Sequence, residues 1–68
     1  ENLNQQETFT LAHQNHQKNN FKVAENLYKK VLQKNPEHFE TIFCLGSLYL
    51  QTKNLKLAKT FLQKALNF

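Results

Sequence analysis

Histidine, cysteine and serine side chains supply the candidates for metal binding and nucleophilic catalysis. His13 and His16 are three residues apart, so on a helix they share one face and could present two nitrogen ligands to a metal ion. No carboxylate or cysteine on that helix face supplies a third ligand. We therefore interpret the pair as polar side chains on an exposed or groove-lining face, and we expect no metal site.

Cys44 lies in an apolar run, Ile42–Leu45, where a free cysteine usually behaves as a small hydrophobic residue. A catalytic thiolate needs a base and an electropositive setting, and His38 lies six residues away on a different face of the same helix. Ser47 has no base or orienting acid at a useful spacing. Since a Gly-rich phosphate loop and paired carboxylates are also absent from the sequence, we predict no catalytic residue and no cofactor.

The size and composition of the chain narrow the function classes further. A chain of 68 residues holds one small domain, which nearly excludes an independent enzyme with both a cofactor site and a substrate cleft. One cysteine forms no intramolecular disulfide, and one glycine and one proline argue against a strand-and-turn architecture. The sequence has no membrane-spanning stretch and no signal peptide, so we expect no membrane insertion and a cytoplasmic location. It also lacks an initiator methionine, so we expect a segment of a longer protein.

The net charge of +4 comes from nine lysines and no arginine. Nucleic-acid readers usually depend on arginine for bidentate contacts to phosphates and bases. A scattered set of lysines is more typical of a solvated surface, and we expect no nucleic-acid partner.

An internal repeat organises the chain. When residues 1–34 are aligned with residues 35–68, identical residues occur at equivalent positions along the whole 34-residue period. The identical pairs are Phe9 and Phe43, Leu11 and Leu45, Gln17 and Gln51, Asn20 and Asn54, Lys22 and Lys56, Ala24 and Ala58, Lys30 and Lys64, and Leu32 and Leu66.

Each repeat unit has the apolar spacing of two helices joined by a short turn, which predicts an all-α fold of four antiparallel helices. Asn19 is expected to adopt the left-handed conformation that ends a helix, and Asn20 to cap the next one. Asn35, Pro36 and Glu37 have the residue types of a helix start. The predicted helices are 5–18, 21–34, from Asn35–Glu37 to about 52, and 55–67.

Small residues occupy equivalent positions in the two units. Ala12 and Gly46 lie in the middle of their helices, where a glycine costs about 1 kcal/mol in helix propensity. We expect Ala24 and Ala58 to face them, so that the helices of each unit approach closely. The residues of the predicted apolar stripes are Phe9, Leu11, Ala12, Asn15, Ala24, Leu27, Tyr28, Val31, Leu32, Ile42, Leu45, Gly46, Tyr49, Ala58, Phe61, Leu62, Ala65 and Leu66.

This pattern resembles the tetratricopeptide repeat, a family of 34-residue helix–turn–helix units. Residues 37–68 match its Leu-Gly pair, its Tyr and its two Ala, at Leu45-Gly46, Tyr49, Ala58 and Ala65, with Ile42 at the common Trp position and Leu62 at an aromatic one. Residues 5–36 match at Leu11-Ala12, Ala24, Tyr28 and Pro36, and depart at Thr8, Asn15 and Val31. The resemblance implies one domain over 1–68, an α-solenoid of two repeats without a separate capping helix.

The resemblance also implies a function in protein–protein interaction. The first helices of such repeats line a concave groove, and we expect this groove to bind a protein or peptide. Phe9 and Phe43 are equivalent rings that could anchor the partner, or both could pack between the repeats instead. Relatives that grip a C-terminal carboxylate use Lys and Asn, whereas the corresponding places here hold Phe9, His13 and Cys44. The predicted binding residues are Phe9, His13, His16, Phe43, Ser47 and Leu50.

Three alternatives stay open. The chain could self-assemble into homo-oligomers, because two repeats leave apolar residues of the last helix uncovered, among them Leu55, Leu62, Leu66 and Phe68. It could bind RNA, as the similarly built pentatricopeptide repeats do. It could also be the recruitment segment of a larger transferase-type enzyme.

Overall fold

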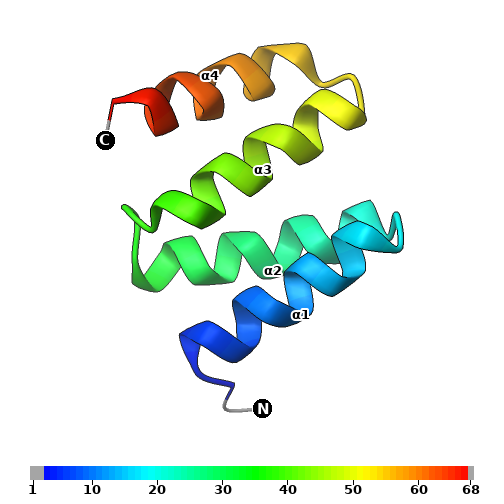
Figure 1. Cartoon of the computed structure of the whole chain (residues 1–68), viewed down its shortest axis with the longest axis vertical. Helices are drawn as coiled ribbons and strands as arrows, with labels where there is room; N and C mark the ends of the chain where they lie inside the picture. Colours follow the sequence, from blue (N-terminus) through cyan, green and yellow to red (C-terminus); the bar gives the residue numbers. More distant parts are fainter. Residues whose placement is uncertain (1–2, 68) are drawn as a thin grey trace.

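The computed structural model describes residues 3–67, which form two helical hairpins (Figure 1). The first hairpin packs against the second mainly through α2 and α3. Figure 1 shows the helices in chain order, from α1 at one end to α4 at the other. Residues 3–67 contain no strand, and the predicted all-α fold of four helices is confirmed. The helices are α1 (Gln5–Gln17), α2 (Phe21–Lys34), α3 (Phe39–Gln51) and α4 (Leu55–Leu66).

The two hairpin turns have the same backbone geometry. Asn19 and Lys53, which are equivalent in the repeat, both have φ near 65°. The N–H groups of the residues that follow, Asn20 and Asn54, each donate to a carbonyl five residues back at 2.8 Å. This is the hydrogen-bond pattern of a Schellman motif, which satisfies carbonyls at the ends of α1 and α3. The left-handed conformation predicted for Asn19 is confirmed.

The helix starts differ from the prediction. Asn20 and Asn54 precede α2 and α4 but make no side-chain capping bond, and the Asn20 amide donates to Asn15 Oδ1 at 3.1 Å instead. The predicted start of α3 at Asn35–Glu37 was wrong, since these residues form a turn. His38 is the N-cap, and its Nδ1 accepts from the Thr41 N–H at 3.2 Å.

A capping box that the sequence reading missed starts α1. Asn4 Oδ1 accepts from the Glu7 N–H at 2.8 Å, and Glu7 Oε1 accepts from the Asn4 N–H at 3.1 Å. This reciprocal pair satisfies two backbone donors at the helix start.

The core joins both hairpins and contains most of the residues predicted for it. Leu11 was predicted to face inward but is exposed, whereas Thr8, Thr41 and Leu48 are buried and were missed. Leu66 is exposed, as expected for an uncovered side of the last helix. The core cluster consists of Ala12, Ala24, Tyr28, Leu45, Leu48, Tyr49 and Ala58, with partly buried Phe9, Phe21, Leu27, Leu32, Cys44 and Phe61 packed against it.

Gly46 confirms the expected close approach between helices, with a different neighbour. A Cβ added at Gly46 would lie 2.8 Å from Leu62 Cδ2 and 3.3 Å from the Leu62 backbone N. The nearest side chain on α4 is therefore Leu62 rather than the predicted Ala58. A side chain at position 46 would therefore force Leu62 to move.

Candidate functional site

The predicted binding residues come from α1 and α3, and the structure places the two equivalent phenylalanines differently. Phe9 is partly buried, with its ring centroid 6.0 Å from that of Tyr28 and 5.5 Å from that of His38. Phe43 is 51% exposed and stacks on Phe39 at a centroid distance of 6.4 Å. The start of α3 covers Phe9, whereas no later helix of residues 3–67 covers Phe43.

His16 connects the two hairpins. Its Nδ1 lies 2.9 Å from the Tyr28 hydroxyl on α2, and its Nε2 forms a hydrogen bond with Gln51 Oε1 on α3. Because an amide oxygen can only accept, Nε2 is the donor in the hydrogen bond with Gln51. Both ring nitrogens of His16 thus form hydrogen bonds with other side chains of the protein.

The remaining predicted residues lie at or near the surface. His13 is exposed and its ring stacks on Phe9 at 6.2 Å. Leu50 is exposed and Ser47 is partly buried. Over residues 3–67, no group of three or more His, Cys, Asp or Glu side chains is arranged to hold a metal ion.

Charge is segregated between the helices. Neither α1 nor α3 contains a lysine, and each contains one glutamate, Glu7 and Glu40. Four lysines lie in α2 and three in α4, and the other two, Lys18 and Lys53, lie in the turns that follow α1 and α3. The α1–α3 face, by which we mean Phe9, His13, His16, Phe43, Ser47 and Leu50, therefore belongs to lysine-free helices.

A second connection between the hairpins joins Tyr49 on α3 to Glu25 on α2. The Tyr49 hydroxyl donates to Glu25 Oε2 at 2.7 Å, and Lys29 Nζ lies 3.2 Å from the same oxygen. The hydrogen bond from Tyr49 holds the pKa of Glu25 below its usual value, with Lys29 adding to the effect. Burial raises the pKa of Tyr49, as does its bond to the carboxylate. The sequence reading missed Glu25, because no local pattern pairs it with a residue so far along the chain.

Cys44 has no features of a nucleophile. The thiol is partly buried beside the Tyr28 hydroxyl, and burial raises the pKa of Cys44. The pKa of Tyr28 is also raised, mainly by burial. These groups are protonated at neutral pH and serve the packing between α2 and α3.

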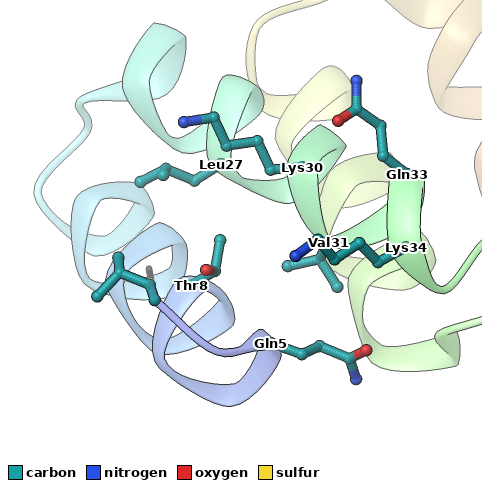
Figure 2. A pocket seen from close by; sticks show the side chains of 8 residues that line it. Gln5, Thr8, Leu27, Lys30, Val31, Gln33 and Lys34 are labelled. Carbon is teal, nitrogen blue, oxygen red and sulfur yellow. The ribbon is translucent and has the colours of Figure 1, made fainter. Parts of the chain in front are cut away.

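Two pockets lie on the α1 side of the molecule, away from the predicted residues. One of about 220 Å³ opens between α1 and α2, with Thr8 contributed by α1 and Leu27 and Val31 by α2 (Figure 2). The other, of about 300 Å³, is formed by residues 3–14. No residue of the α1–α3 face lines either pocket. The first is lined by Leu3, Gln5, Thr8, Leu27, Lys30, Val31, Gln33 and Lys34.

Comparison with known proteins decides the family. A family model for the tetratricopeptide repeat matches residues 16–68. The chain belongs to the tetratricopeptide repeat family. Its Leu45-Gly46 pair, Tyr49, Ala58 and Ala65 lie within the matched range and are all buried, as the repeat requires. No curated protein and no solved structure matches the chain.

Membership in the tetratricopeptide repeat family indicates the general function. Repeats of this family are generally protein–protein interaction modules and are typically not catalytic. No helix within residues 3–67 has the length and apolar character needed to cross a membrane.

Proposed function

We propose that this tetratricopeptide repeat segment is a non-enzymatic scaffold that binds a peptide or protein on its α1–α3 face. One observation carries the proposal: the exposed, apolar Phe43 and Leu50 lie on a lysine-free helix. Exposed aromatic side chains are common anchors for peptides, because burying a ring removes a large apolar area from water.

The charge distribution supports a partner segment that is neutral or mildly basic. A carboxylate on the α1–α3 face would meet Glu40, one turn before Phe43, and no lysine of these two helices. Apolar contacts would then dominate the affinity, so binding should change little between low and moderate salt.

Phe9 and His16 are partly buried members of the α1–α3 face. Their rings pack against Tyr28, so substituting them would disturb the fold together with any binding. Phe43 and Leu50 are better positions for a test, because their exposed side chains contribute little to folding.

The test is selection of binding peptides from a random displayed library, followed by calorimetric titration with purified variants. We expect Phe43→Ser to weaken binding at least about ten-fold, as for a central anchor. Val23→Ser is the matched control, because Val23 is an exposed apolar residue of α2. Selected peptides that bind wild type, Phe43→Ser and Leu50→Ser equally would refute the proposal.

Self-assembly is a second candidate function, favoured by the exposure of Leu55 and Leu66 on α4. Phe68, which was predicted to belong to the same surface, lies outside the described residues. Sedimentation velocity over a wide concentration range tests this candidate, and a constant monomer mass would exclude it.

A further inference from the structure

We propose that α2 and α4 together present a lysine-rich outer surface that binds the face of a lipid bilayer containing anionic lipids, without crossing it. The outer surface lies on the sides of the two helices that point away from their hairpin partners. It is separate from the α1–α3 face, and the proposal does not depend on the function proposed for that face. The outer surface consists of Lys22, Val23, Lys30, Lys56, Leu57 and Lys64.

Helix periodicity gathers these side chains on one side of each helix. The buried residues of α2 are Ala24, Tyr28 and Val31, and the three outer residues of α2 are centred about 150° around the helix from them. On α4 the buried residues are Ala58 and Ala65, and the corresponding angle is about 130°. The turns before α2 and α4 have the same φ and the same closing hydrogen bonds, so the outer residues take equivalent places on the two hairpins.

Lysines recur on the outer surface at an interval of one repeat. Lys22 and Lys30 of α2 correspond to Lys56 and Lys64 of α4, and all four residues are exposed. The one acidic residue of the two helices is Glu25, which lies 3.9 Å from Lys22 and accepts a hydrogen bond from α3. The outer surface therefore keeps a positive charge on both helices.

The composition of the outer surface is unlike that of a protein interface. Protein interfaces are enriched in aromatic residues and arginine and depleted in lysine. The outer surface instead combines lysines with the aliphatic residues Val23 and Leu57, which are 48% and 37% exposed. An acidic protein is therefore a less suitable occupant than a surface that attracts charge alone.

Nucleic acid also fits the outer surface less well. Proteins that bind phosphates and bases with fixed geometry favour arginine, and those that bind single strands stack bases on aromatic rings. The chain has no arginine. Phe21, Tyr28 and Phe61, the aromatic residues of α2 and α4, belong to the core cluster or pack against it.

An anionic bilayer matches both features of the outer surface. Its negative surface potential attracts each nearby lysine without requiring a fixed register, and each such lysine strengthens binding about five-fold. Aliphatic side chains between the lysines can enter the headgroup region, as they do in interfacial helices. The lysine-free helices α1 and α3 contribute nothing to this surface, so the α1–α3 face stays available to a partner.

Flotation of the 68-residue chain with unilamellar vesicles tests the proposal. One set of vesicles contains phosphatidylcholine alone, and the other contains about one third phosphatidylserine. At low salt we expect at least about ten-fold tighter binding to the anionic vesicles, and this binding should weaken as the salt concentration rises. Equal binding to the two sets of vesicles would overturn the proposal.

Variants of exposed residues locate the binding surface. Lys30→Gln/Lys64→Gln should weaken binding to anionic vesicles about twenty-fold. The matched control, Lys18→Gln/Lys53→Gln, removes the same charge from the two turns and should have a much smaller effect. Circular dichroism should show equal helix content in both variants, because all four side chains are exposed. Equal losses in the two variants would overturn the proposal, because binding would then depend on net charge alone.

Three further probes separate the other possible occupants and surfaces. Phe43→Ser should leave vesicle binding unchanged, and a loss there without a loss in Lys30→Gln/Lys64→Gln would place the vesicle on the α1–α3 face and overturn the proposal. Displacement of the chain from anionic vesicles by a polyglutamate peptide of equal total charge would favour an acidic protein instead. Displacement by an oligonucleotide of equal total charge would favour nucleic acid. We expect neither probe to displace the chain.

Discussion

Gly46→Ala tests whether the close contact between α3 and α4 explains the single glycine of this chain. In an open helix, replacing glycine by alanine stabilises by about 1 kcal/mol. Here the new Cβ would lie 2.8 Å from Leu62 Cδ2 and 2.9 Å from Leu62 Cγ, well inside ordinary contact distance. Overpacking of this kind costs about 1–3 kcal/mol. We expect the steric cost to exceed the gain, with a net destabilisation of about 1 kcal/mol.

Leu62→Ala provides the second arm of a double-mutant cycle. Leu62 is partly buried, so this variant should lose about 1–2 kcal/mol on its own, less than a fully buried leucine. It also removes both close side-chain atoms. In this background, Gly46→Ala should recover most of its helix propensity and become neutral or stabilising. The coupling energy between the two sites is then about 1–2 kcal/mol.

Urea unfolding followed by circular dichroism measures the four free energies of the cycle. Ala12→Gly is a control at the equivalent position of the first hairpin; it should cost at least about 1 kcal/mol and show no coupling to Leu62→Ala. Additive effects of Gly46→Ala and Leu62→Ala, within about 0.5 kcal/mol, would refute the steric explanation.

Three further predictions concern the buried polar groups. Because the folded-state pKa of Glu25 is lowered, its stabilisation is complete above the unfolded-state value of about 4.3 and is lost as the pH falls through the folded-state value. Tyr49→Phe should cost about 1–2 kcal/mol at pH 7 and less below about pH 4, which urea titrations across pH would show; an equal cost at every pH would contradict this. Cys44, with its raised pKa, should react with iodoacetamide much more slowly in the folded chain than in urea by mass spectrometry, and equal rates would count against its burial. His16→Ala removes the hydrogen bonds to α2 and α3 and should lower the free energy of unfolding by about 1–2 kcal/mol, measured by thermal melts. An unchanged melting temperature would show that these hydrogen bonds do not stabilise the contact between the hairpins.

Local residue patterns were sufficient to predict most of the fold. The 34-residue repeat, the apolar spacing and the turn residue Asn19 predicted four helices. For three of these helices, the predicted ends lie within about one residue of those observed. Helix formation depends on neighbours three and four residues apart, so this information is present in short segments. The start of α3 was the exception, because the His38 and Thr41 side chains, not Asn35, set the first turn.

Only the tertiary structure decided how equivalent residues differ. Phe9 and Phe43 occupy equivalent positions in the repeat. The start of α3 nevertheless packs on the Phe9 ring, whereas the Phe43 ring is exposed. Glu25 and Tyr49 are 24 residues apart, and His16 and Gln51 are 35 apart, so neither pair follows from helix periodicity. Hydrogen bonds between the hairpins form only once α3 has packed on α2, because side-chain direction and burial depend on which surface each helix covers.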